Sequence, residues 1–184
     1  MRYQRLFIGV LPQPEIVKDL AAIQQVFSSK IGKAGLKVRL TKPENLHLTL
    51  HFIGPAEEKA VDTLLARVSE LAERHRSFSQ VLDVPVAFPS KARCRVAGLG
   101  ANAPGTALLK LWQDLGAALH GSSLPLENRT YVPHVSLLRC PQPMRFPDFL
   151  VEPYALRIDS YALIESRLGG GGSKYEILKS FRLL

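Results

Sequence analysis

Residues 46–54 read LHLTLHFIG, and residues 133–139 repeat the pattern in weaker form as PHVSLLR. In each copy one apolar residue separates a histidine from a hydroxyl residue, and polar and apolar residues alternate. A period of two is typical of a β-strand, on which the histidine and the hydroxyl project from one face about 6.6 Å apart. The histidines are 87 positions apart (134 − 47) in a chain of 184 residues. We therefore interpret the copies as one strand-borne unit present once in each half of the protein.

The spacing of apolar residues elsewhere predicts three amphipathic helices. Helical periodicity places them at residues 15–29, 55–72 and 108–119. Gln24 falls on the polar face of the first helix, and Gly121 is expected to close the third.

Short alternating or apolar runs predict strands between these helices. Besides the two histidine motifs, they are at residues 6–10, 36–40, 78–88, 92–99, 154–166 and 175–183. The proline-rich residues 141–153 are expected to be irregular, and residues 169–173 (GGGGS) to form a long, flexible tip on a final hairpin. Hairpin-like strands that alternate with single helices indicate an α+β fold with antiparallel sheets. Because the two halves are alike, we expect two lobes around a pseudo-twofold axis.

The composition favours a polyanionic partner. The chain carries 24 Lys and Arg against 16 Asp and Glu, a net charge of +8, which suits RNA or phosphate groups. The basic residues are scattered, so a solvated surface explains them equally well. No apolar run reaches the roughly 18 residues of a membrane helix, and the N-terminus does not resemble a signal peptide. Two cysteines, Cys94 and Cys140, give no disulfide framework, so we expect a reducing, cytoplasmic setting. We also expect a monomer that does not bind membranes.

Two familiar kinds of catalytic site fit the motifs poorly. On a helix His47 and His51 could share a zinc ion, but on a strand they are about 13 Å apart. No third ligand stands at convincing spacing. A Ser-His-Asp site is also disfavoured, because Ser136 has no Gly-x-Ser-x-Gly elbow and no acid is obviously paired with His134. We expect neither a metal nor another cofactor.

The duplication itself suggests acid–base chemistry on a phosphate. One neutral imidazole can take a proton from water while a protonated imidazole gives one to the leaving oxygen, each transfer contributing about 10²–10⁴ in rate. Thr49 and Ser136 can donate hydrogen bonds to non-bridging oxygens, at about 1.5–3 kcal/mol each. Because imidazole pKa values lie near neutrality, one neutral and one charged histidine can coexist near pH 7. A bell-shaped pH profile for kcat is therefore expected.

The pair His47-x-Thr49-x-x-Phe52 and His134-x-Ser136-x-x-Arg139 resembles the two signatures of the two-histidine (2H) phosphoesterase superfamily. Within it, the chain is similar to the RNA 2′,3′-cyclic phosphodiesterases, also called 2′-5′ RNA ligase-like proteins. The likeness extends to residues 5–9 (RLFIG), 52–54 (FIG) and 166–175, and it covers essentially the whole chain.

The resemblance implies one bilobal α+β domain spanning residues 1–184. Two antiparallel-rich sheets with flanking helices would surround a central cleft, each lobe would supply one motif, and the lobes would exchange terminal strands. It also implies hydrolysis of 2′,3′-cyclic phosphates, at RNA ends or in cyclic nucleotides, to 2′-phosphomonoesters.

Carried over by position, His47 and His134 would be the acid–base pair. The sequence does not distinguish which is the acid and which is the base; family analogy alone favours His47 as the acid and His134 as the base. Thr49 and Ser136 would hold the phosphate, although the family more often has Thr where Ser136 stands.

At the fifth position after each histidine, Phe52 would stack on the terminal base and Arg139 would lie near the phosphate. By strict alternation both side chains lie on the wrong strand face. Phe52 needs a bend or bulge after Leu50 to reach the site, and Arg139 needs a strand end or a twist.

The remaining polar residues receive weaker interpretations. His51 is expected at the rim of the site, and His75 and His120 are expected to have no chemical role. Five basic residues could line an RNA path or simply face solvent: Arg39, Lys42, Arg93, Arg95 and Arg129. Two alternatives to hydrolysis stay open, namely 2′-5′ RNA ligation by the reverse reaction and an RNA- or nucleotide-binding module without chemistry.

Overall fold

The computed structural model describes residues 3–32, 37–120, 130–169 and 172–184. Its helices are α1 (Pro14–Gly32), α2 (Glu58–Ala72) and α3 (Thr106–His120), with two short 3-10 helices, η1 (Pro43–Asn45) and η2 (Lys91–Arg93). The strands are β1 (Tyr3–Val10), β2 (Arg39–Leu40), β3 (Leu48–Glu57), β4 (Phe78–Leu82), β5 (Val84–Phe88), β6 (Cys94–Gly100), β7 (His134–Met144), β8 (Tyr154–Ile158), β9 (Ser160–Gly169) and β10 (Gly172–Arg182). None of the three helices combines the length and the apolar character needed to cross a bilayer within these residues.

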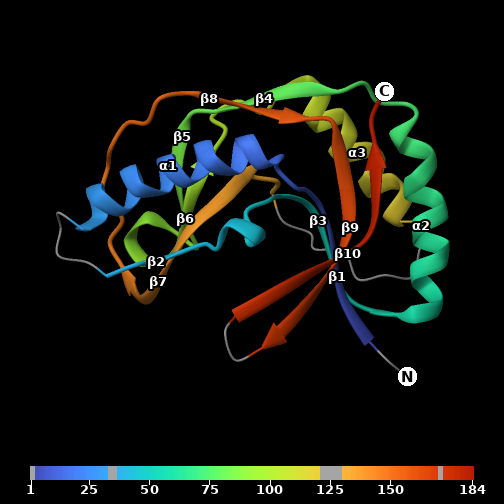
Figure 1. The fold of residues 1–184 in the computed structure, drawn as a ribbon, viewed down its shortest axis with the longest axis horizontal. Helices are drawn as coiled ribbons and strands as arrows, with labels where there is room; N and C mark the ends of the chain where they lie inside the picture. Colours follow the sequence, from blue (N-terminus) through green and yellow to red (C-terminus); the bar gives the residue numbers. More distant parts are fainter. Residues whose placement is uncertain (1–2, 33–36, 121–129, 170–171) are drawn as a thin grey trace.

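The strands form one large and one small sheet, both antiparallel (Figure 1). The large sheet has the order β10-β9-β1-β3-β7-β6-β5, and the short strand β2 also pairs with β7, at Leu138 and Arg139. The small sheet consists of β4 and β8. Between β3 and β7 only Leu48 and Val135 pair, so the large sheet consists of two halves that meet at one point. The predicted α+β fold with antiparallel sheets is confirmed.

Two of the helices cross from one half of the sheet to the other. Helix α1 follows β1 but packs against β7, whereas α3 follows β6 and packs against β3. Helix α2 also lies against β3 and contacts β10 and α3, on the right of Figure 1. Each half of the sheet carries one histidine motif. The prediction that these halves are lobes with exchanged terminal strands stays a prediction.

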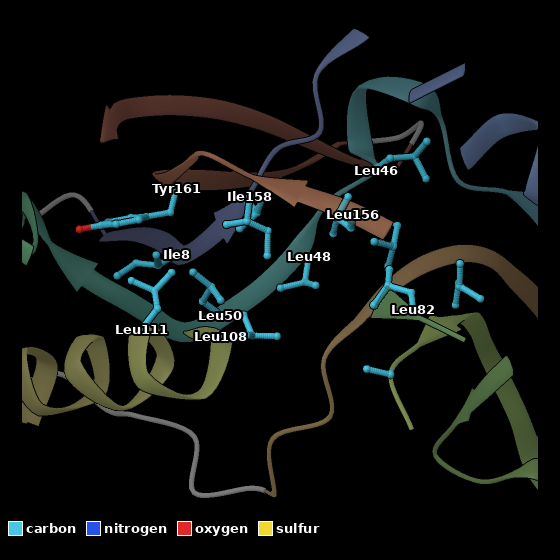
Figure 2. Close-up of a cluster of buried hydrophobic side chains, with 14 of the residues drawn as sticks. Ile8, Leu46, Leu48, Leu50, Leu82, Leu108, Leu111, Leu156, Ile158 and Tyr161 are labelled. Carbon is cyan, nitrogen blue, oxygen red and sulfur yellow. The ribbon is translucent and has the colours of Figure 1, made fainter. Parts of the chain in front are cut away.

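The apolar face of each motif is anchored in the core. Leu46, Leu48 and Leu50 are at most 2 % exposed, and they lie among side chains from β1, α3 and β8 (Figure 2). Val135 and Leu137 are equally buried in the second motif. Burial of a side chain of this size stabilises the fold by about 1.5–3 kcal/mol. Both motifs are therefore held firmly by the residues that alternate with the histidines and hydroxyls.

The structure corrects two sequence-based boundaries. The predicted strand at 78–88 divides at Asp83, and its parts enter different sheets. Residues 141–144 continue β7 instead of being irregular; β7 pairs with β6 at Met144 but not at residues 140–143, so the prolines there interrupt no ladder hydrogen bond.

The final hairpin also differs from the prediction. Strand β8 pairs with β4, while β9 pairs with β10 as far as Gly169 opposite Gly172. The long tip predicted at 169–173 was therefore wrong; residues 170–171 and Gly121 lie outside the described residues.

Candidate active site

A cavity of about 680 Å³ lies where β3, β7 and α3 meet, and it collects most of the predicted site residues. Its wall includes Thr49 and Phe52 from β3 and His134, Ser136 and Arg139 from β7. His47 stands two residues before Thr49 and is not part of this wall. The charges of His134 and Arg139 nevertheless lower the pKa of His47, so its ring lies within their electrostatic reach.

A β-bulge in the first motif brings Phe52 to the cavity. Ile8 pairs with His51 and Gly9 pairs with Thr49, which leaves Leu50 without a partner on β1. An extra residue of this kind reverses the alternation of the side chains that follow it. Leu50 stays buried, and Phe52 emerges at the cavity 49 % exposed. The bulge that the sequence analysis required for Phe52 is present.

The second motif contains a bulge at the equivalent position. Ala97 pairs with Leu138 and Gly98 pairs with Ser136, so Leu137 has no partner on β6. Leu137 and Leu138 are both buried, and Arg139 reaches the cavity wall. In both motifs the extra residue is the third after the histidine, and the residue delivered is the fifth. Arg139 reaches the cavity through a bulge, whereas a strand end or a twist had been predicted.

Glycine faces the hydroxyl residue in both half-sites. A Cβ atom on Gly9, opposite Thr49, would lie 3.1 Å from the Leu48 carbonyl oxygen. A Cβ atom on Gly98, opposite Ser136, would lie only 2.2 Å from the Val135 carbonyl oxygen. The two bulged strands therefore depend on close backbone approach at matched positions.

The histidine rings are oriented by backbone carbonyls in the same way. His47 Nδ1 lies 2.7 Å from the Asn45 oxygen, and His134 Nδ1 lies 2.7 Å from the Val132 oxygen. A carbonyl only accepts, so each Nδ1 carries the proton and each Nε2 is left to exchange protons with a ligand. Each carbonyl belongs to the second residue before its histidine.

Burial makes both imidazoles weaker bases than free histidine. Burial lowers the pKa of His47 to about 4. The hydrogen bond to Asn45 raises this pKa in part, and the charges of His134 and Arg139 lower it slightly further. Burial also lowers the pKa of His134, by less, and the hydrogen bond to Val132 opposes it. Both rings are therefore mainly neutral at pH 7 in the free protein, unlike the mixed state expected from ordinary pKa values.

Aromatic rings that the sequence analysis did not single out surround the histidines. The His47 ring centroid lies 5.0 Å from Phe7 and 5.1 Å from Tyr175, which meet each other at 5.0 Å. Phe88 lies 4.4 Å from His134. Phe7 belongs to the strand predicted at residues 6–10, and it is 2 % exposed. Only the neighbouring strands show that this buried ring also packs on the catalytic candidate.

A stack of three rings joins α3 to the site. His51 stacks on Trp112 at 5.4 Å, and Trp112 stacks on Tyr131 at 5.0 Å. His51 Nε2 donates to the Trp112 carbonyl at 2.7 Å, and the Tyr131 hydroxyl donates to the Thr49 carbonyl at 3.3 Å. Gly116 makes room, since a Cβ there would lie 3.2 Å from His51 Cε1. His51 lines the cavity and braces it against α3.

One further histidine lines the cavity, and the described residues contain no cluster of metal ligands. His120, for which no chemistry was expected, lines the cavity and bonds the Gly116 carbonyl through Nδ1 at 2.9 Å. Across the four described ranges, no three His, Cys, Asp or Glu side chains gather as a metal site would require. The expectation of a site without metal or cofactor stays a prediction.

Comparisons with known proteins identify the family. Residues 10–97 match the sequence model of LigT-like phosphoesterases. An RNA 2′,3′-cyclic phosphodiesterase of Thermus thermophilus is 30 % identical over 150 residues, covering 77 % of this chain and 73 % of that protein. Another, from Thermotoga maritima, is 26 % identical over 182 residues, covering 95 % and 92 %.

Solved structures agree with the sequence relatives. The crystal structure of a protein from Thermus thermophilus has a TM-score of 0.82 at 27 % identity and covers 97 % of both chains. The paired motifs, the fold and the sequence relatives lead to one conclusion: this chain is an enzyme of the LigT-like phosphoesterase family.

Proposed function

We propose that the enzyme hydrolyses 2′,3′-cyclic phosphates at RNA ends to 2′-phosphomonoesters, with His47 and His134 as the acid–base pair. The observation that supports this proposal is the pair of matched bulged strands, from which Thr49, His134 and Ser136 line one cavity. The His47 ring, two residues before Thr49, lies within electrostatic reach of His134 and Arg139. Relatives named RNA 2′,3′-cyclic phosphodiesterases and the net charge of +8 support the same substrate class.

The cavity offers a role for each side chain in the reaction. Thr49 and Ser136 donate hydrogen bonds to the non-bridging oxygens, and Arg139 balances the charge of the phosphate. One neutral imidazole removes a proton from water as the water oxygen bonds to phosphorus. The bond from phosphorus to the 3′ oxygen breaks, and the other imidazole protonates that oxygen. The phosphate stays on the 2′ oxygen.

The exposed ring of Phe52 provides a surface for the terminal base. Stacking of a base on an aromatic side chain contributes about 1–3 kcal/mol and tolerates different bases. Phe7 lies 6.1 Å behind Phe52 and supports its ring. The terminal nucleotide is thereby held by its base in one half-site and by its phosphate between the two.

The protonation states set a condition on the mechanism. The active form carries one proton, and in the free enzyme that proton resides mainly on His134, because the pKa of His47 is lowered further. The assignment of His47 as general acid, which came from family analogy, requires the proton to move to His47 when substrate binds. A bound phosphodiester anion raises both imidazole pKa values and favours the charged form.

Product analysis tests the proposal. An oligonucleotide ending in a 2′,3′-cyclic phosphate is incubated with the enzyme and a chelator, and the ³¹P spectrum distinguishes 2′- from 3′-monoesters. We expect the 2′-monoester, at a rate that the chelator does not change. A 3′-monoester would contradict the assigned leaving oxygen, and binding without turnover would leave a nucleotide-binding module. Joined strands in the presence of a 5′-hydroxyl oligonucleotide would show the reverse, ligating direction.

A further inference from the structure

Strand β2 places a second arginine beside Arg139. It pairs with β7 so that Arg39 lies opposite Arg139 and Leu40 lies opposite Leu138 (β2 and β7 in Figure 1). Residues directly opposite on antiparallel strands project from the same face, with Cα atoms about 4.5–5.5 Å apart. Both arginines are exposed, and Arg139 lines the cavity. Arg39 therefore stands on the cavity face, one strand further out.

A buried amide fixes this arrangement. Gln24 of α1 donates through Nε2 to the Thr41 carbonyl at 2.8 Å and to the Leu137 carbonyl at 2.7 Å. The Thr41 amide donates to the same Leu137 carbonyl at 2.9 Å. Gln24 is only 3 % exposed, so its predicted place on the polar face of the helix was wrong. Its two bonds join the end of the two-residue strand β2 to the bulge that delivers Arg139.

The juxtaposition of the two arginines has no structural explanation within the described residues. Like charges directly opposite destabilise a sheet. Three other surface cations there are balanced by carboxylates: Lys91 by Asp148, Lys110 by Asp114, and Arg167 by Glu165 and Glu176. For Arg39 and Arg139, no ion pair is found among those residues. Besides burial, the positive charge of Arg139 lowers the pKa of His47, so Arg139 lies within electrostatic reach of that imidazole. Arg39 stands next to Arg139 on the neighbouring strand.

We propose that Arg39 and Arg139 form a second anion site, which binds the phosphodiester on the 5′ side of the terminal nucleotide. Arginine suits this role because its planar fork of donors matches phosphate oxygens. Arg139 borders both phosphates, and Arg39 contacts only the outer one. This inference rests on the proposed function and deepens it, since it makes a polynucleotide, not a cyclic mononucleotide, the preferred substrate.

Kinetics on two substrates test the second anion site. One is a nucleoside 2′,3′-cyclic phosphate, which lacks a 5′ phosphate, and the other is a dinucleotide ending in the same cyclic phosphate. We expect Arg39→Gln to lose about tenfold in kcat/KM on the dinucleotide, mostly through KM, and less than twofold on the mononucleoside. The matched control is Arg182→Gln, an exposed arginine on β10 seven residues from Tyr175, roughly 23 Å along the strand. It should behave as wild type on both substrates.

A binding experiment separates failure of this inference from failure of the proposed function. Fluorescence anisotropy measures the affinity of a labelled RNA oligonucleotide ending in a 2′-phosphate, and it needs no turnover. Arg39→Gln should weaken binding and reduce the slope of log affinity against log salt by about 0.7, as expected for one lost contact to a single strand. If Arg39→Gln matches Arg182→Gln in affinity and in slope, or lowers activity equally on both substrates, the second anion site is refuted.

Discussion

The two half-sites, β1–β3 around His47 and β6–β7 around His134, share a backbone and differ in their side chains. Both have a bulge at the third residue after the histidine, a glycine opposite the hydroxyl, and a carbonyl that orients Nδ1. At the fifth position they diverge, with Phe52 in one and Arg139 in the other. Under the proposed function, the shared part would supply a proton-transfer group and a hydroxyl for the phosphate twice. The divergent part would separate an aromatic side for a base from a cationic side for phosphates.

The two histidines also differ in the aromatic rings that pack against them. His47 lies against both Phe7 and Tyr175, whereas His134 has Phe88. Closer enclosure accounts for the larger decrease in the pKa of His47, since burial is its main cause. Two motifs with matching backbones therefore hold imidazoles of different basicity, which is what an acid and a base require.

Removal of either imidazole should have the largest effect on activity. We expect His47→Ala and His134→Ala each to reduce kcat on a nucleoside 2′,3′-cyclic phosphate by about 10²–10⁴. Thermal denaturation should show a folded protein in both cases, and His75→Ala, which removes a histidine that does not line the cavity, serves as the control. If one variant retains near-normal turnover, that half-site does not supply a proton-transfer group.

The pH dependence should reveal the inequality of the two histidines. Because both pKa values are lowered from 6.5, that of His47 to about 4, the singly protonated enzyme is most abundant at acidic pH. We expect kcat/KM to be highest between about pH 4 and 6.5. Above the pKa of His134 it should fall tenfold per pH unit, or about 100-fold over two units. An optimum at or above pH 7, or NMR titration of both imidazoles at one pH, would rule out the inequality.

The two facing glycines should respond differently to the same substitution. Gly98→Ala places Cβ 2.2 Å from a backbone oxygen, against 3.1 Å for Gly9→Ala. We expect losses in the free energy of unfolding of about 2–3 kcal/mol for Gly98→Ala and about 1 kcal/mol for Gly9→Ala, from urea denaturation. Gly32→Ala, with open space around its Cβ, is the control. Equal losses would mean that the β6–β7 half is no more tightly packed than its counterpart.

The divergent fifth positions should give the smallest and most selective effects. Phe52→Ala should raise KM about tenfold, since base stacking contributes about 1–3 kcal/mol, and more for purine than for pyrimidine substrates. Arg139→Gln should raise KM without regard to the base, and it should weaken the dependence on salt. Steady-state kinetics on adenosine 2′,3′-cyclic phosphate and cytidine 2′,3′-cyclic phosphate separate the two patterns. Identical base dependence in both variants would remove the distinction between an aromatic and a cationic side.

The histidine motifs illustrate what could be predicted and why. Alternation in residues 46–54 is a local property, so it identified the strands, the anchored leucines and the face shared by each histidine and its hydroxyl. The same alternation placed Phe52 and Arg139 on the wrong face, because a bulge depends on the partner strand. Gly9 and Gly98 allow that partner to approach, and neither was singled out. Gln24 was misplaced because helical periodicity shows that a residue is polar but not which buried carbonyls it satisfies.

The sequence by itself determined which functional groups are available: two imidazoles, two hydroxyls and the strand period that aligns each pair. Those features follow from residue types and from backbone geometry over a few residues. The tertiary structure decided how they are used, through the single Leu48–Val135 pair that joins the half-sheets, the bulges at Leu50 and Leu137, and the register that sets Arg39 opposite Arg139. Each of these is a relation between segments far apart in the chain, and side-chain periodicity within one segment carries no information about it.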